Sequence, residues 1–302
     1  MSLWLAATLF AAAVQSIRFL LQKRLSTGGA AHAALSPAAN TFARFVWAPP
    51  IVGAGLAAWW LWGGGSVPAI GAGFWPFAAA GALSQILATI CVVALFAHRN
   101  FAVGIAFSKT TVLMTVGTGF VLLGETVGPS AFLAMLVGFG GVLILSLPAG
   151  AAFRPFNRAS ALGLGSGALF SISAVGYRGA SLAVQSDVAL ERAALTLVLV
   201  TALQTLMLLA WLAWRDRAGL RQVFRDWRRT LPVGVTSLLG SLGWFTAYTL
   251  QTAALVNAVA QVELILSMLI SRFALGERQT RREIAGIILV GVSVVGLILL
   301  RG

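Results

Sequence analysis

The sequence predicts an all-α integral membrane protein. Of its 302 residues, 59% are hydrophobic and only 10% are charged, whereas an average soluble domain carries about 25% charged residues. Apolar runs long enough to cross a bilayer as a helix recur along the whole chain. Helices are the expected spanning structure, because a backbone in hydrocarbon must satisfy its hydrogen bonds within its own segment.

Ten apolar segments are long enough to span the membrane. They cover residues 3–21, 37–62, 74–97, 101–123, 128–147, 160–184, 188–213, 231–252, 254–275 and 281–300. The first segment lacks the basic start of a signal peptide, so we expect it to be a retained helix. The stretch from Pro148 to Pro155 separates the fifth and sixth segments and predicts a boundary between two five-helix halves, 1–150 and 151–302.

The two halves share a short motif. Leu123-Gly124-Glu125 ends the fourth segment, and Leu275-Gly276-Glu277 ends the ninth. A short turn and a Gly-rich segment follow each motif, and the two glutamates are 152 residues apart. Because five segments per half is an odd number, we expect the second half to insert upside down. Secondary transporters built from such inverted repeats place their substrate site near mid-membrane, between the repeats.

The ten segments, the midpoint break and the duplicated motif resemble the drug/metabolite transporter superfamily, in particular its EamA-type members. In that family an acidic residue follows Leu-Gly at the end of the fourth helix of each half. The resemblance implies a secondary transporter that works by alternating access and exports amino acids, aromatic ones among them, or related compounds. Family members often carry a proline in the middle of the fourth and ninth helices. Segments 101–123 and 254–275 contain none, so a proline kink is not expected there.

The net charge of +13 comes mostly from arginines in short connections, which is a topology signal and not a nucleic-acid-binding face. Connections 1–2, 3–4, 5–6, 7–8 and 9–10 hold these residues, while connections 2–3, 4–5 and 8–9 have no Lys or Arg. The positive-inside rule then puts both termini outside a bacterial-type inner membrane, although in the family they are commonly cytoplasmic. The longest basic connection, 215–229, is read as a solvated loop in preference to an interfacial amphipathic helix.

Two opposite charges fall inside predicted spans. Lys109 lies in the fourth segment and Glu263 near the centre of the ninth, and the motif alignment makes Gln261 the counterpart of Lys109. A charge near mid-bilayer costs at least about 2.5–3.5 kcal/mol, so it normally faces a cavity or a partner. In one interpretation Lys109 attracts a substrate carboxylate and Glu263 an ammonium group or the coupling proton, as a zwitterionic amino acid would require. In the other they form a structural ion pair between the halves.

Four further residues are substrate-binding candidates. They are Gln15 on the first segment, Gln85 on the third, and Trp244 and Tyr248, which share a face of the eighth.

Other polar residues lie nearer the ends of their segments. We expect Arg18 and Arg44 to extend towards the membrane surface. Tyr177 and Arg178 are expected to anchor the end of the sixth segment at the interface.

The sequence offers little for catalysis. Its one cysteine, Cys91, and its two histidines, His32 and His98, form no metal-ligand or catalytic pattern, and no phosphate-binding GxxxxGK[ST] loop is present. We therefore expect no enzyme activity, cofactor or metal. The expected partners are a small-molecule substrate and the lipid bilayer, for a monomer or homodimer. The alternative function is an integral-membrane enzyme or a lipid-handling protein.

Overall fold

The computed structural model describes residues 2–27, 33–63, 66–95, 108–146, 158–266 and 281–299. The described chain is helical apart from one short two-stranded sheet. Its elements are α1 (Leu3–Thr27), α2 (Pro37–Phe45), α3 (Ala48–Gly63), β1 (Ala69–Ile70), α4 (Phe74–Leu95), α6 (Thr111–Leu123), α7 (Pro129–Ser146), α8 (Arg158–Leu182), β2 (Val184–Gln185), α9 (Ala189–Arg215), α10 (Arg217–Arg225), α11 (Trp227–Leu250), α12 (Ala253–Val259) and α14 (Arg281–Leu299).

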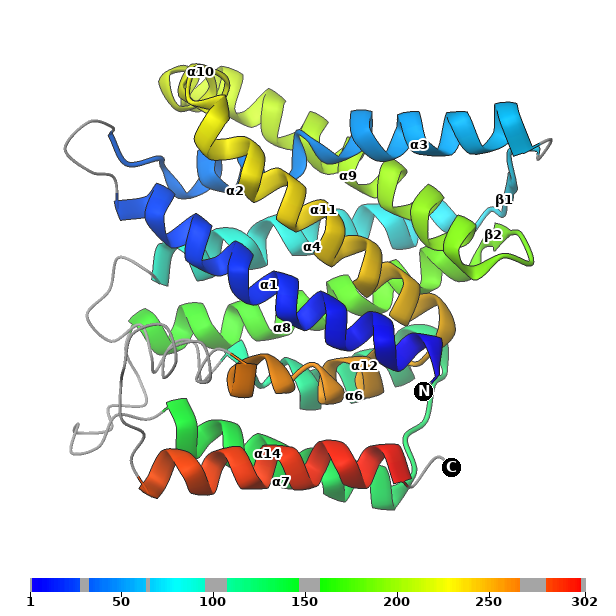
Figure 1. Cartoon of the computed structure of the whole chain (residues 1–302), viewed down its shortest axis with the longest axis vertical. Helices are drawn as coiled ribbons and strands as arrows, with labels where there is room; N and C mark the ends of the chain where they lie inside the picture. Colours follow the sequence, from blue (N-terminus) through cyan, green and yellow to red (C-terminus); the bar gives the residue numbers. More distant parts are fainter. Residues whose placement is uncertain are drawn as a thin grey trace.

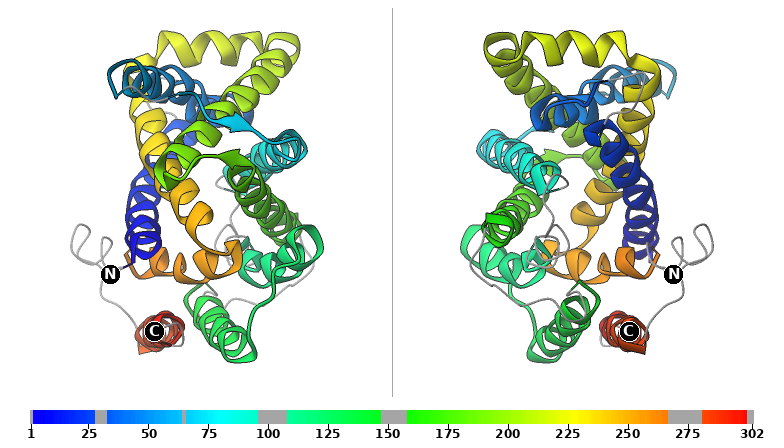
Figure 2. Two further views of the ribbon diagram at one scale, coloured as in Figure 1. Left: turned by 90° about the vertical axis from the view of Figure 1, so that its right-hand side faces the viewer. Right: turned by 90° about the vertical axis from the view of Figure 1, so that its left-hand side faces the viewer.

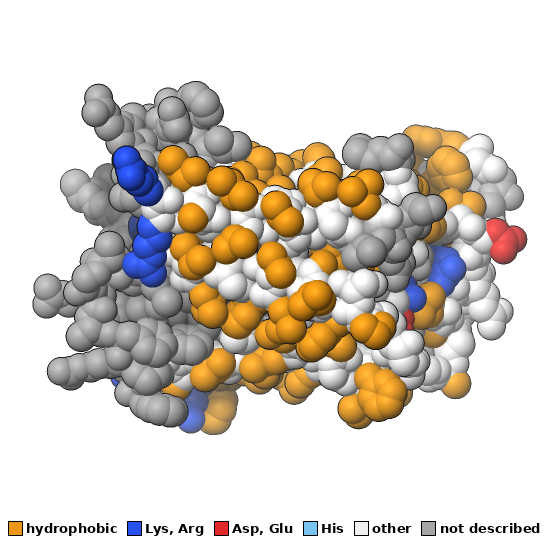
Figure 3. Space-filling view, turned by 90° about the horizontal axis from the view of Figure 1, so that it is seen from below, with side chains coloured by type: hydrophobic (Ala, Val, Ile, Leu, Met, Phe, Trp, Pro, Cys, Tyr) orange, Lys and Arg blue, Asp and Glu red, His pale blue; other side chains and the backbone are white. Residues whose placement is uncertain are grey.

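Most helices run across the longest axis of the molecule, between two opposite ends of the helical bundle, at the left and right of Figure 1. α1 begins and α14 ends at the same end, where β1 pairs with β2 in antiparallel register. The connection that carries α10 lies at the opposite end. Seen from the side of the α7–α14 pair, apolar side chains cover the band between the two charged ends (Figure 3). That distribution is the one expected for a protein whose flank faces lipid.

Five segments are apolar and long enough to cross a membrane: Leu3–Thr27, Pro37–Gly63, Phe74–Leu95, Arg158–Leu182 and Ala189–Arg215. Shorter apolar helices accompany them within the described residues. The expected all-α membrane fold is therefore confirmed, whereas ten spans arranged as two inverted repeats stay a prediction. Glu277, the stretch from Pro148 to Pro155, His32 and His98 lie outside the described residues.

Three helix pairs form the frame: α1 with α11, α4 with α8, and α7 with α14. Each pair joins one helix from each predicted half. Small residues allow the close approach that helix pairs in membranes use. A Cβ added at Gly141 of α7 would lie 2.9 Å from the carbonyl oxygen of Gly286 on α14, and one added at Gly176 of α8 would lie 2.8 Å from the carbonyl oxygen of Phe77 on α4.

The connection 215–229 is largely helical, so the interpretation as a loop was wrong. The Asp216 carboxylate accepts the backbone N–H of Gly219 at 2.8 Å, which caps the start of α10. Val223 is buried, while Arg217 and Arg221 are exposed. α10 lies across the end of the helical bundle (Figure 2). It is therefore an amphipathic helix at one end of the molecule, where an interfacial helix would lie.

Two turns interrupt the helices without any proline. Residues Lys109 and Thr110 form a turn before α6, and Ala260 and Gln261 form one after α12. At both turns the backbone changes to i→i+3 bonds, for example Val112 N to Lys109 O at 3.3 Å and Leu264 N to Gln261 O at 3.0 Å. The absence of proline in these two segments therefore did not exclude local breaks. The breaks place the charged side chains beside the central cavity described next.

Candidate functional site

A cavity of about 750 Å³ lies between the two predicted halves. Its described walls come from α1, α2, α4, α6, α8, α11 and α12 and from the two turns beside α6 and α12. Tyr248 and Asn257 line it, as do Lys23 and Arg24 in the last turns of α1. Lys23 and Arg24 are exposed, so the cavity opens at the end where α1 finishes. All six predicted site residues line this cavity: Gln15, Gln85, Lys109, Trp244, Tyr248 and Glu263.

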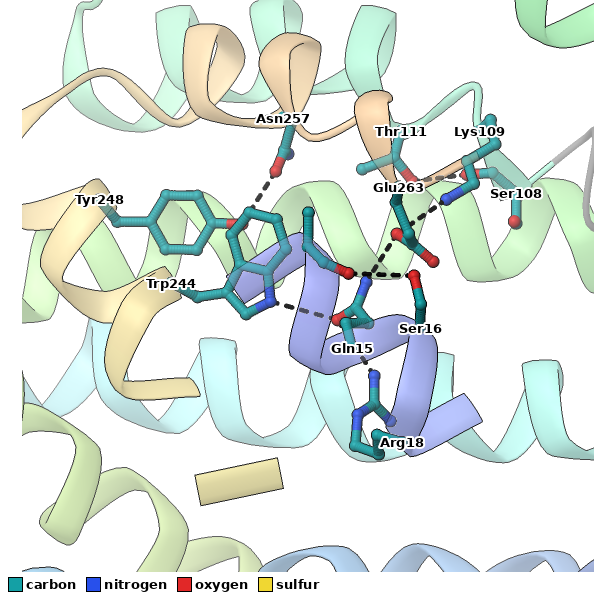
Figure 4. A network of polar contacts seen from close by, with 11 residues as sticks. Gln15, Ser16, Arg18, Ser108, Lys109, Thr111, Trp244, Tyr248, Asn257 and Glu263 are labelled. Atoms are coloured by element: carbon teal, nitrogen blue, oxygen red, sulfur yellow. Dashed lines mark hydrogen bonds and ion pairs between the residues drawn. The ribbon is translucent and has the colours of Figure 1, made fainter. Parts of the chain in front are cut away.

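Glu263 is the centre of a polar network (Figure 4). Its Oε2 accepts from Lys109 Nζ at 3.3 Å and from Gln15 Nε2 at 2.9 Å. The Glu263 side chain is 6% exposed and the Lys109 side chain 20%. The structure therefore brings the two opposite charges together, as the ion-pair interpretation required, and it also places them on the cavity wall. Lys109 and Glu263 therefore form an ion pair and line the cavity at the same time.

Gln15 connects this ion pair to the aromatic wall. Its Oε1 accepts from Trp244 Nε1 at 3.2 Å and from Arg18 Nη2 at 3.1 Å. Trp244 stacks on Tyr248 with ring centroids 6.1 Å apart and an interplanar angle of 20°. The Gln15 amide is thus hydrogen-bonded to the Arg18 guanidinium, the Glu263 carboxylate and the Trp244 indole at once.

Arg18 is buried and does not extend to the surface, which corrects the expectation from sequence. It is 3% exposed, and its Nη1 donates to Gln22 Oε1 at 2.6 Å. Gln15, Arg18 and Gln22 are three and four residues apart, so they form one polar stripe on an otherwise apolar helix. This spacing was the signal that places Arg18 on the same helix face as Gln15, and both residues line the cavity.

Arg44 was also expected at the surface and is also buried, with 5% exposure. Its Nε donates to Ser237 Oγ at 3.1 Å and its Nη1 to Thr89 Oγ1 at 2.8 Å. With the Gln85 amide oriented so that its nitrogen donates to Ser173 Oγ, the amide oxygen accepts from both terminal nitrogens of Arg44 at 3.0 and 2.9 Å. The role of Gln85 in the fold is therefore to hold this guanidinium against the cavity.

The end of the molecule where α1 begins is closed by a second set of contacts. Glu125 of the first Leu-Gly-Glu motif forms an ion pair with Arg178 of α8. Arg178 Nη1 also donates to the carbonyl oxygens of Tyr248 and Gln251, each at 2.7 Å, at the end of α11. Gly124 adopts φ +66°, a left-handed conformation that suits glycine. That turn ends α6 and directs Glu125 to its partner.

Tyr177 and Arg178 are therefore not interfacial anchors. Tyr177 is 6% exposed, its hydroxyl accepts from Gln204 Nε2 at 2.9 Å, and its ring stacks on Phe245 with centroids 4.4 Å apart. The Tyr248 hydroxyl donates to Asn257 Oδ1 at 2.8 Å. These contacts close the inner end of the cavity. Asn257 was missed from the sequence because it lies near the start of the predicted segment 254–275, where a polar residue is not unusual.

Gln261, the counterpart of Lys109 in the motif alignment, is buried at 2% exposure. Neither its amide nitrogen nor its amide oxygen has a hydrogen-bond partner among the described residues. A buried amide normally has partners, and we have no physical account of this exception. Over the same described ranges, no group of three or more His, Cys, Asp or Glu residues is arranged to hold a metal ion.

Comparisons with known proteins agree with this architecture. Residues 159–299 match the model of the EamA-like transporter family. A protein of known crystal structure aligns over 98% of this chain and 96% of its own with a TM-score of 0.69. At 17% identity that likeness shows the fold alone. A search of curated proteins found no match.

The family match confirms the resemblance inferred from the duplicated motif, and it favours transport over enzymatic chemistry. Residues 159–299 are therefore similar to the EamA-like transporter family, which is part of the drug/metabolite transporter superfamily.

Proposed function

We propose that the protein is a secondary transporter of small polar metabolites and that the central cavity is its substrate site. The observation that carries the proposal is the cavity itself. Its volume of about 750 Å³ falls in the range of small-molecule sites, about 300–1,000 Å³. Charged groups at membrane depth mark substrate and ion pathways, and here Lys109, Glu263, Arg18 and Arg44 all line one cavity.

The helix contacts support two inverted repeats, residues 1–150 and 151–302. If a two-fold axis relates the halves, the first segment corresponds to the sixth and the third to the eighth. A contact between the first and eighth segments then requires an equivalent contact between the sixth and third. Both pairs occur, as α1 with α11 and as α8 with α4. The fifth and tenth segments, α7 and α14, also pair with each other, as the same symmetry requires. The separation in sequence between the turns at 109–110 and 260–261 is close to the 152 residues that separate the two glutamates of the motif.

Alternating access follows from this arrangement. The cavity opens beside Lys23 and Arg24, while Tyr248, Asn257 and the Glu125–Arg178 pair close the other end. Rocking of one repeat against the other would break the Glu125–Arg178 pair, which joins the two repeats, and open the opposite end. The basic end is cytoplasmic by the positive-inside rule, so this conformation faces the cytoplasm of a bacterial-type inner membrane and the termini lie outside.

Glu263 is our candidate for the coupling group. It is the one acidic residue that lines the cavity among the residues the structure describes. Its partners come from the first repeat: Gln15 lies in α1 and Lys109 in the turn before α6. Glu263 itself lies in the second repeat. Relative motion of the repeats would change these contacts. Each conformation would then bind a proton with a different affinity, which coupled transport requires.

The test is solute transport by the purified protein in liposomes, with empty liposomes as the control. We expect saturable uptake of at least one charge class of small solute, and faster exchange when the same solute is preloaded inside. Absence of uptake across anionic, zwitterionic and cationic solutes would refute the proposal.

A further inference from the structure

The cavity is strongly biased towards positive charge. Lys109, Arg18 and Arg44 line its interior, and Lys23 and Arg24 lie at its mouth. Among the described lining residues Glu263 alone carries a carboxylate. A zwitterionic substrate would need an available carboxylate for its ammonium group as well as a cation for its carboxylate. The excess of cationic side chains over carboxylates in the cavity therefore does not suit a zwitterion.

The carboxylate of Glu263 is already engaged. Lys109 and Gln15 both donate to its Oε2, and the side chain is nearly buried. An incoming ammonium group would have to displace the Lys109 ammonium, which would leave that cation without its partner. Capture of a cation at Glu263 is therefore disfavoured in this conformation.

Arg18 and Arg44 are in the opposite situation. Both are buried, and in the part of the chain that the structure describes neither has a carboxylate within ion-pair distance. Their hydrogen-bond partners are neutral amides and hydroxyls. A buried charge normally has an opposite charge as partner, and here none of the described protein groups supplies one to Arg44.

From this imbalance, and taking transport through the cavity as given, we propose that the substrate is a small organic anion whose carboxylate or phosphate group binds Arg18 and Arg44. A guanidinium presents five N–H donors in a planar fork that matches both kinds of oxyanion. The two terminal nitrogens of Arg18 each donate one hydrogen bond to an amide oxygen among the described residues, which leaves donors for a ligand.

The rest of the cavity defines the body of this anion. Phe170, Trp244 and Phe245 line it, and stacking of Trp244 on Tyr248 gives a flat apolar wall. An aromatic or other flat apolar group fits such a wall. At the mouth, Lys23 and Arg24 would raise the local concentration of anions and speed their entry at low salt.

The experiment uses four probes that share a phenyl group on a short alkyl chain and differ in charge. Phenylpropionate carries a carboxylate, phenylethyl phosphate a phosphate, phenylalanine both an ammonium and a carboxylate, and phenylethylamine an ammonium alone. Equilibrium binding of each radiolabelled probe to the purified full chain in detergent is measured beside its transport in liposomes. Comparison of the two anions separates a carboxylate source from a phosphate source.

We expect one or both anions to bind at least tenfold more tightly than phenylalanine and phenylethylamine. Arg18→Gln and Arg44→Gln should each weaken anion binding by roughly 10- to 100-fold, as expected for one hydrogen-bonded ionic contact. Arg18→Lys keeps the charge and loses the planar fork, so its loss should be smaller than that of Arg18→Gln. Arg217→Gln, exposed on α10 and outside the cavity, is the matched control and should bind like the unaltered protein.

The outcomes separate this inference from the proposed function. Transport of phenylalanine or phenylethylamine, with neither anion binding nor competing, would overturn the anion inference and leave the transporter intact. Anion binding that Arg18→Gln and Arg44→Gln do not weaken, measured on variants whose helical circular dichroism matches the unaltered protein, would also overturn it. Anion binding without transport of any probe would support the anion site and refute the proposed transport.

Discussion

Removal of the Lys109 ammonium should destabilise the protein more than removal of the Glu263 charge. The two groups are 3.3 Å apart, and at an effective dielectric constant of about 20 their attraction is about 5 kcal/mol. Desolvation of both groups offsets most of that attraction. We therefore expect a net coupling free energy of about 1–3 kcal/mol between them.

The asymmetry follows from exposure. Lys109→Met leaves the carboxylate of Glu263, whose side chain is 6% exposed, with the Gln15 amide as its one side-chain donor among the described residues. Such an uncompensated charge costs up to about 3–5 kcal/mol. Glu263→Gln leaves the Lys109 ammonium, which is 20% exposed and borders the cavity, where water can solvate it. Its cost should be well below that of Lys109→Met.

A double-mutant cycle measures both quantities. Lys109→Met, Glu263→Gln and the double variant are unfolded by a denaturing detergent in mixed micelles, and the loss of helix is followed by circular dichroism. The double variant should be more stable than Lys109→Met alone. Two results would refute the ion-pair reasoning. One is that the free-energy changes of the two single variants add up to that of the double variant within about 0.5 kcal/mol. The other is that Glu263→Gln is less stable than Lys109→Met.

Three further outcomes are expected. In liposomes with an imposed pH gradient, Glu263→Gln should retain downhill exchange and lose accumulation of solute, and accumulation that persists would exclude Glu263 as the coupling site. Gly141→Ala should lower the free energy of unfolding by about 1–3 kcal/mol, because its Cβ would meet the backbone of α14 at 2.9 Å. Gly140→Ala, which meets nothing within 4 Å, should leave stability nearly unchanged, and equal effects of the two would contradict the packing. A C-terminal reporter that is active only outside the cytoplasm should be active in cells, and a silent reporter on an expressed fusion would reverse the orientation.

The sequence was sufficient for the membrane class, because the lengths of apolar runs are set directly by the thickness of the bilayer. It was also sufficient to identify four residues that line the cavity, since a charge or amide deep in a span has few favourable places other than an interior one: Gln15, Gln85, Lys109 and Glu263. Trp244 and Tyr248 were identified because they share a helix face. Lys109 and Glu263 were found by the first argument alone. Their contact depends on the turns beside α6 and α12, and no proline or glycine marks those turns.

The buried arginines show where sequence reasoning failed. Arg18 and Arg44 lie near the predicted ends of their segments, where a long side chain ordinarily reaches the interface. Arg18 has a local partner, Gln22, one turn along the same helix. Arg44 is held by Gln85 and Ser237, which come from two other helices and reach it only in the folded protein. Glu125 and Arg178 pair across the halves for the same reason. Long-range partners of this kind are set by the crossing of helices, which periodicity along one segment does not report.

The central claim, that solute crosses the membrane through this cavity, is tested most directly at Ser241. Ser241 lines the cavity on α11, and Cys91 is the chain's one cysteine, so a Cys91→Ser, Ser241→Cys variant carries one thiol in the cavity wall. Its transport in liposomes is measured before and after labelling with a bulky maleimide. We predict that saturating transported solute slows the labelling and that complete labelling abolishes transport, while the Cys91→Ser parent is unaffected. Full transport by the completely labelled variant would contradict the account.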